Sequence, residues 1–185
     1  MLPPPEPNEV AEPNAELLFS SEDIFSWKAL DGAEKYRISI SRDASGLEPV
    51  IVQELTDYSF APAMDATDTY YLAIAGIDEQ GFVGLALNTR LNYVSIEDAA
   101  PPELSIRREA GISQVSSVGY DGAIELQLSH SIDGAIVNRR VIDSLSDEIS
   151  LELDPSIDWV FRARKVLGET AVSRYGNSYL LKATQ

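Results

Sequence analysis

Four arginines on two predicted strands are the side chains of this sequence best suited to recognise a ligand. The strand at residues 135–142 carries two of them and the strand at residues 157–166 the others: Arg139, Arg140, Arg162 and Arg164. Guanidinium groups bind carboxylates and phosphates through paired hydrogen bonds. If the two strands are neighbours, their outward face forms an arginine patch for an acidic protein or for a glycan with uronic or muramic acids. The alternative is ordinary face charge, paired with Asp or Glu across the strands.

The sequence contains little that could carry out a reaction. His130 is the single histidine, it lies at a polar strand end, and no Gly-x-Ser-x-Gly motif accompanies it. A serine triad is therefore not indicated. One histidine and no cysteine exclude a zinc site of ordinary composition within one chain. We expect a protein that is not an enzyme and that has no cofactor.

The acidic residues are abundant, but their positions indicate turns rather than paired catalytic carboxylates. Most lie at turn signals, where Asp bonds its own backbone: Asp65, Asp68, Asp78, Glu79, Asp121, Asp133, Asp143 and Asp147. Calcium is the stronger alternative, because loops of sandwich modules bind it through carboxylates. The strand at residues 70–77, however, places Asp78 roughly 25 Å from Asp65 and Asp68. We therefore expect no metal site.

Charge and composition narrow the class of partner. The chain has 185 residues, of which 44% are hydrophobic, and a formal net charge of −16. This charge opposes the approach of nucleic acid and of anionic membrane. No apolar run approaches the ~18 residues that a membrane helix needs. The start, MLPPPEPNEV, lacks the features of a signal peptide, so we expect either a cytoplasmic protein or, as the prolines favour, a piece of a longer exported chain.

Alternation of polar and apolar residues predicts an all-β protein in two parts. Residues 1–13 contain five prolines and are expected to form a stiff linker, with a short proline-rich ligand as the alternative. Residues 14–97 hold seven short strand candidates. Residues 98–102 form a second linker with two prolines, and residues 103–185 hold about seven more strands. This pattern predicts two immunoglobulin-like β-sandwiches in tandem.

Two strings in the first predicted sandwich resemble a known kind of module. FSWKALDGAEKYRISISRD and TYYLAIAGIDEQGFVG, within residues 14–94, are similar to the fibronectin type III-like modules of FecR/LysM domain-containing bacterial envelope proteins. Ala73 stands where those modules often have arginine. The second predicted sandwich matches only in outline, through LDPSIDWVFRARKV. The resemblance implies a periplasmic or cell-envelope location in a Gram-negative bacterium, and transmembrane signalling as an alternative role.

Large aromatic residues are expected to fill the cores of both sandwiches. Alternation places five of them inside: Trp27, Tyr36, Tyr70, Trp159 and Phe161. Tyr70 is expected to form a tyrosine corner, and residues 78–81 a hairpin turn with Gly81 at positive φ. The stretch from residue 69 to residue 84 is thus predicted to be core strand and turn rather than a ligand loop.

We expect a non-catalytic pair of modules that acts as a spacer and as a surface for a protein or an anionic cell-wall glycan. It is expected to be a monomer that neither binds nucleic acid nor inserts into a membrane. The alternatives are an accessory domain of a FecR-type signalling regulator and a carbohydrate-binding fragment. For the last of these, exposed aromatics beside a carboxylate pair would be the distinguishing feature, and the candidate tyrosines are scattered: Tyr71, Tyr93, Tyr120 and Tyr175.

Overall fold

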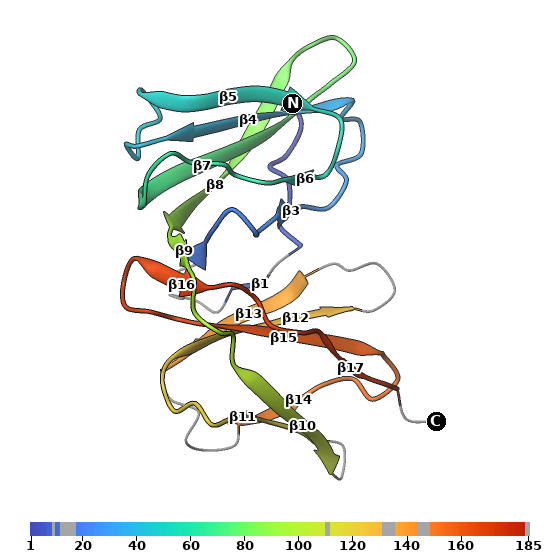
Figure 1. The fold of residues 1–185 in the computed structure, drawn as a ribbon. Helices are drawn as coiled ribbons and strands as arrows, with labels where there is room; N and C mark the ends of the chain where they lie inside the picture. The colour runs from blue at the N-terminus through green and yellow to red at the C-terminus, as the bar shows by residue number, and fades with distance from the viewer. Residues whose placement is uncertain (9, 12–17, 110–111, 131–135, 144–148, 184–185) are drawn as a thin grey trace. The chain divides into compact units, whose positions relative to one another are not determined.

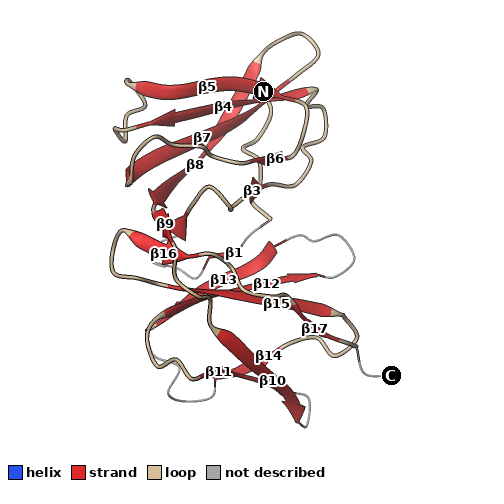
Figure 2. Ribbon diagram, in the orientation of Figure 1, coloured by secondary structure: helices blue, strands red, loops and turns tan. Residues whose placement is uncertain are grey.

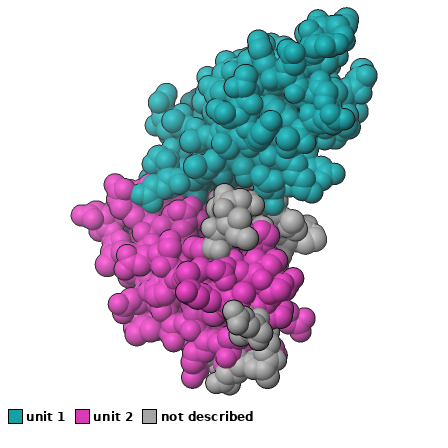
Figure 3. Space-filling view, turned by 90° about the vertical axis from the view of Figure 1, so that its right-hand side faces the viewer, with its two compact units in different colours: residues 1–9, 16–95 teal, residues 10–15, 96–185 magenta. Residues whose placement is uncertain are grey.

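The structure, a computed structural model, describes residues 1–8, 10–11, 18–109, 112–130, 136–143 and 149–183. Within these ranges all regular elements are strands (Figure 1, Figure 2). No helix long and apolar enough to cross a membrane occurs in these ranges. The chain divides into two compact units, coloured in Figure 3: unit 1 comprises residues 1–9 and 16–95, and unit 2 comprises residues 10–15 and 96–185.

Unit 1 consists of two sheets. The larger has the order β2-β8-β7-β4-β5, and the smaller pairs β3 with β6. The bounds are β2 Leu18–Phe19, β3 Phe25–Ser26, β4 Lys35–Ser41, β5 Pro49–Leu55, β6 Ser59–Phe60, β7 Asp68–Ile77 and β8 Val83–Tyr93. Neighbours pair antiparallel except that β2 runs parallel to β8. This order corresponds to strands A′-G-F-C-C′ and B-E of an immunoglobulin-type sandwich.

Alternation along β4 decides which side chains fill the core of unit 1. Tyr36, Ile38 and Ile40 are buried, whereas Arg37 and Ser39 lie on the opposite face of the sheet. Trp27 is only 1% exposed and packs edge-on against Tyr36, with 5.3 Å between ring centroids. Both belong to one buried cluster with Tyr70, so all three aromatics occupy the positions that the sequence predicts.

Two local arrangements hold the ends of β7. The hydroxyl of Tyr70 donates a hydrogen bond of 3.0 Å to the carbonyl oxygen of Ala66, which is the predicted tyrosine corner. Beyond the strand, the Asp78 carboxylate accepts hydrogen bonds from the backbone N–H groups of Gln80 (3.1 Å) and Phe82 (2.8 Å). Gly81 has φ of 83°, a conformation that favours glycine. The stretch is core strand and turn, as expected.

The N-terminal residues differ from the expected linker. Residues 1–8 belong to unit 1 and lie along its strands. Pro7 bridges to Trp27, and the backbone N–H of Lys28 donates to the carbonyl oxygen of Glu6 at 2.8 Å. Further along, the N–H of Leu85 donates to the carbonyl oxygen of Leu2 at 2.9 Å. Proline lacks only its N–H donor, so this segment binds the sandwich through its carbonyl groups and is not a free spacer.

Unit 2 is a second sandwich. One sheet has the order β1-β13-β12-β15-β17 and the other β10-β11-β14. The bounds are β1 Val10–Ala11, β10 Glu103–Glu109, β11 Ile112–Val118, β12 Ile124–His130, β13 Ile136–Ile142, β14 Ile149–Glu152, β15 Trp159–Lys165 and β17 Tyr179–Leu181. Two further strands, β9 (Ser95–Glu97) and β16 (Ala171–Ser173), pair with each other. Strands β10 to β17 give the orders A-B-E and C′-C-F-G, so the predicted tandem of immunoglobulin-like, fibronectin type III-like sandwiches is confirmed.

The core of unit 2 follows the alternation of β15. Trp159, Phe161 and Ala163 are buried in one cluster, as predicted. The indole N–H of Trp159 donates to the carbonyl oxygen of Asp154 at 3.0 Å, so the polar end of this large ring is satisfied. Unit 2 begins again at Ile96 after unit 1 ends at Ser95, which places the division two residues before the linker expected at residues 98–102.

Candidate functional site

The two strands that carry the predicted arginine patch are not neighbours. Strand β12 lies between β13 and β15, and its Gln127 is aligned with Arg139 on one side and with Arg162 on the other. Arg140 is aligned instead with Leu126, whose side chain faces the core. Because side chains alternate along a strand, Arg139 and Arg140 lie on opposite faces, and a patch of all four arginines does not form.

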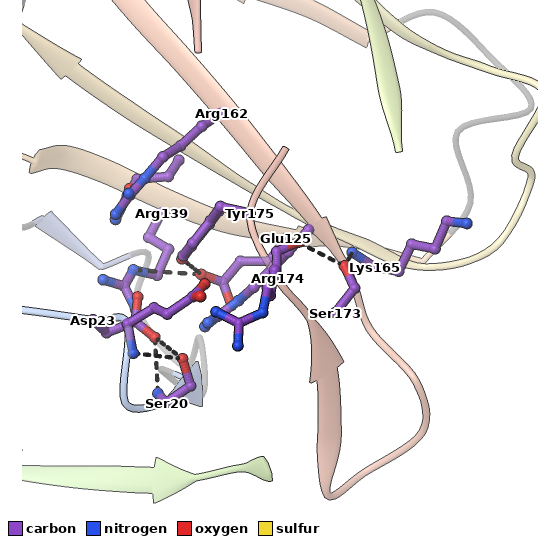
Figure 4. A network of polar contacts seen from close by, with 12 residues as sticks. Ser20, Asp23, Glu125, Arg139, Arg162, Lys165, Ser173, Arg174 and Tyr175 are labelled. Atoms are coloured by element: carbon purple, nitrogen blue, oxygen red, sulfur yellow. Dashed lines mark hydrogen bonds and ion pairs between the residues drawn. The ribbon is translucent and has the colours of Figure 1, made fainter. Parts of the chain in front are cut away.

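Two of the four arginines are buried around one carboxylate. Arg164 Nη2 lies 2.9 Å from Oε2 of Glu125, and Arg139 Nε lies 3.5 Å from Oε1. The side chains of these three residues are at most 1% exposed. The hydroxyl of Tyr175 also donates to Oε1 of Glu125 at 2.8 Å (Figure 4). The prediction of a solvent-facing patch is therefore wrong for Arg139 and Arg164.

The remaining two arginines are more accessible but lie apart. Arg162 is half-buried, donates from Nε to the side-chain oxygen of Gln127, and lies over the ring of Tyr175 at 4.0 Å from its centroid (Figure 4). Arg140 is exposed at the opposite face. The alternative, pairing with an acid across the strands, describes Arg164 correctly, since Glu125 is its partner in the β12–β15 register. Within unit 2, one carboxylate thus links arginines from the two strands on either side of β12.

A groove of about 410 Å³ lies on the outer face of the large sheet of unit 1. The strands β4, β7 and β8 provide its lining, together with the turn after β4. In register across the sheet, Ser39 faces Ala73 and Ala73 faces Asn88; one step along, Ser41 faces Tyr71 and Tyr71 faces Arg90. Small side chains in the middle and larger ones at one end leave this part of the sheet hollow.

One wall of the groove is a turn that is built around Asp43. Its carboxylate accepts hydrogen bonds from the backbone N–H groups of Ser45 (3.0 Å), Leu47 (3.2 Å) and Glu48 (2.9 Å). The Ser45 hydroxyl also donates to it, and this bond, followed by the one from Glu48, lowers the pKa of Asp43 to about 2. Ser45 and Gly46 of this turn line the groove, so the hydrogen bonds to Asp43 shape this wall.

The sequence alone does not predict this groove, although it draws attention to two of the lining residues, Ala73 and Tyr71. The resemblance marked Ala73 as a small residue at a position that often has arginine. Tyr71 directly follows Tyr70 in a strand, so alternation puts its side chain on the opposite face, which is where the structure places it. What the sequence could not show was that Ser39, Ser41 and Asn88 come into register beside them, because this depends on the pairing of strands far apart in the chain.

Within the part of the chain that the structure describes, residues that could support catalysis or bind a metal are not brought together; the candidate acids Asp133 and Asp147 lie outside the described residues. His130 packs edge-on against Trp159, with 4.9 Å between ring centroids. Asp78 holds its own turn, and Asp68 accepts from the N–H of Thr69 at 2.8 Å. Among the described residues, no group of three or more His, Cys, Asp or Glu side chains could hold a metal ion.

The similarities to known proteins are limited to solved structures. No family model and no curated protein matches the sequence. A two-domain fibronectin type III segment of chicken tenascin is 17% identical, covering 86% of this chain and 90% of that one, with a TM-score of 0.38. The chicken CNTN1 FN1–FN3 domains are 13% identical over 98% of this chain and 69% of that one, with a TM-score of 0.40. A chain in a cytokine receptor complex is 16% identical over 86% and 90%, with a TM-score of 0.36.

Proposed function

We propose that this chain is a non-catalytic binding and spacer module of a bacterial cell-envelope protein, and that it contacts its partner through the groove of unit 1. The partner is a protein or an anionic cell-wall glycan. The chain acts as a monomer in the periplasm or at the envelope of a Gram-negative bacterium, without binding nucleic acid or inserting into a membrane.

The groove is the observation that carries this proposal. It is a concave site of about 410 Å³ on a sheet face, and ligand sites are typically concave and pre-formed. Its wall is held by the hydrogen bonds to Asp43, which reduces the entropy lost when a ligand binds. The arginine face of unit 2 is the weaker candidate, because Arg139 and Arg164 are buried against Glu125.

Two properties support the spacer role and the envelope. Each unit has its own buried core, so each keeps its shape without a ligand, as a spacer must. The resemblance of residues 14–94 to fibronectin type III-like modules of FecR/LysM domain-containing proteins supports the envelope location.

Co-sedimentation with envelope fractions tests this function. The purified chain is mixed with peptidoglycan sacculi and, separately, with outer-membrane fragments from a Gram-negative bacterium. We expect the wild-type chain to sediment with one of these fractions. Ala73→Arg fills the groove and should abolish sedimentation, whereas Ala86→Arg adds the same charge on the same face outside the lining residues and should not. Absence of wild-type sedimentation with both fractions, or equal loss in both variants, would refute the proposal.

A further inference from the structure

We infer that the groove of unit 1 holds one or two sugar rings of a glycan, with a preference for a sugar that bears a carboxylate. This inference rests on the proposed function and names the ligand class of that same site.

The floor of the groove favours recognition by side chains alone. Strands β4 and β7 are interior strands of the sheet, each paired on both sides. Their backbone N–H and C=O groups are used in the ladders, so an extended peptide cannot add to the sheet here as it does at a free edge. A ligand in the groove must be recognised through the side chains that line it.

The lining combines small apolar residues with several groups that both donate and accept hydrogen bonds. Hydroxyls come from Ser39, Ser41, Ser45 and Tyr71, and an amide comes from Asn88. Ser41 donates to the carbonyl oxygen of Asp43 at 2.7 Å, and Ser45 donates to the Asp43 carboxylate, so both keep their oxygens as acceptors. A row of oriented acceptors and donors without a deep apolar pocket matches the hydroxyl groups of a sugar better than a peptide side chain.

The size and shape of the groove suit a small ring. About 410 Å³ lies near the lower end of the roughly 300–1,000 Å³ that small-molecule sites occupy. The small methyl group of Ala73 leaves the centre of the groove open for a ring. Tyr71 supplies a half-buried aromatic ring at one end, and such a ring combines an apolar face with a polar tip. A sugar ring likewise has an apolar face and a polar rim.

The charge of the lining residues favours acidic sugars over neutral ones. Arg90 is the one charged residue among the described residues that line the groove. It already takes part in another interaction, but a guanidinium group has five N–H donors and can still donate a charge-assisted hydrogen bond to a carboxylate. The chain as a whole has a net charge of −16, which repels extended polyanions. A glycan with isolated carboxylates therefore fits better than a densely charged one.

Titration of the full chain with matched disaccharides, followed by ¹⁵N NMR, tests this inference. The probes are N,N′-diacetylchitobiose, the disaccharide of N-acetylglucosamine with N-acetylmuramic acid, and an acidic pentapeptide. The two sugars share most of their structure, but only the second has a carboxylate. We expect both sugars to shift amides of β4, β7 and β8, with the acidic sugar binding about tenfold more tightly, a difference of ~1.4 kcal/mol. Arg90→Gln should remove this difference, Ala73→Arg should abolish binding, and Ala86→Arg should leave it unchanged.

The outcomes separate the ligand class from the function. If sugars shift only amides of unit 2, or if Ala73→Arg and Ala86→Arg lose sugar binding equally, the groove is not the sugar-binding site. If the pentapeptide shifts amides and neither sugar does so at millimolar concentration, the inference that the ligand is a glycan is wrong. The binding function still stands in that case if Ala73→Arg prevents sedimentation with envelope fractions. If the wild-type chain binds neither sugar and sediments with neither fraction, both proposals fail.

Discussion

The hydroxyl of Tyr70 donates a 3.0 Å hydrogen bond to the carbonyl oxygen of Ala66, four residues earlier in the chain. The bond ties the loop before β7 to the strand that fills the centre of unit 1, because the ring of Tyr70 is buried among the core residues. Its neighbour Tyr71 points the other way and lines the groove. One dipeptide thus supplies both a core anchor and a wall of the candidate site.

Tyr70→Phe should destabilise unit 1 by about 0.5–1.5 kcal/mol, because the hydrogen bond to the carbonyl of Ala66 is lost while the ring stays in place. Tyr71→Phe is the matched control and should change the stability by less than about 0.5 kcal/mol. Urea unfolding followed by tryptophan fluorescence measures both. Equal midpoints for the two variants would show that the corner contributes nothing.

Glu125→Gln should destabilise unit 2 by about 3–5 kcal/mol, since it removes the carboxylate that pairs with the buried guanidinium groups of Arg139 and Arg164. Glu169→Gln, at an exposed position, is the control for loss of one negative charge. The double variant Glu125→Leu with Arg164→Leu should recover part of the loss. Thermal unfolding followed by circular dichroism reads out all three, and a loss in Glu125→Gln no larger than in Glu169→Gln contradicts a stabilising cluster.

The turn at Asp43 should weaken as the solution becomes acidic. Hydrogen bonds, first from the Ser45 hydroxyl, lower the pKa of Asp43 from 3.8 to about 2. A carboxyl whose pKa is depressed by folding stabilises the fold above its unfolded pKa and loses this effect as the pH falls through the folded value. The stability of unit 1 should therefore decline between about pH 4 and pH 2, and Asp43→Asn should lack this part of the decline. NMR titration of the carboxyl carbon checks the value directly, and a midpoint near 3.8 would contradict the structure.

Gly84→Ala should displace the N-terminal residues from unit 1. A Cβ at position 84 would lie 2.7 Å from both Cβ and the carbonyl oxygen of Leu2, which is closer than packed atoms approach. The hydrogen bond from the N–H of Leu85 to that oxygen should open, and the amide of Leu85 should exchange about tenfold faster, as expected for a loss of ~1.4 kcal/mol.

A shortened chain provides the control for Gly84→Ala. In a variant that lacks residues 1–4, the same substitution has no segment to displace, so its effect on stability should vanish in a double-mutant cycle. If Gly84→Ala costs as much in the shortened chain, the contact with Leu2 is not what limits position 84.

The fold could be predicted from local patterns, whereas the site could not. Alternation in residues 35–41 and 159–165 identified core positions correctly, because a strand has only two faces. The position of Tyr70 near the start of its strand predicted the tyrosine corner. The turn residues 78–81 predicted the hairpin. Each of these features depends on neighbours within a few residues.

Errors arose where the outcome depends on which strands pair. The arginine patch assumed that the strands with Arg139 and Arg162 are adjacent, but β12 lies between them, and its Glu125 pairs with two of the arginines. The residues 1–8 were expected to be a spacer because of their prolines, yet their carbonyl groups are free to accept bonds from unit 1. The polar residues Glu125 and Gln127, which alternate with Ile124, Leu126 and Leu128, were the signal that could have indicated a polar outer face.

Hydroxyl-radical footprinting of the chain bound to an envelope fraction tests most directly that the groove is the binding surface. Two tyrosines of unit 1 serve as reporters in one experiment: Tyr71 lines the groove, and Tyr58, which is 52% exposed, lies outside the lining residues. Binding should lower the oxidation of Tyr71 several-fold and leave Tyr58 unchanged. Saturated binding with unchanged oxidation of Tyr71 would show that the partner contacts another surface and would contradict the account.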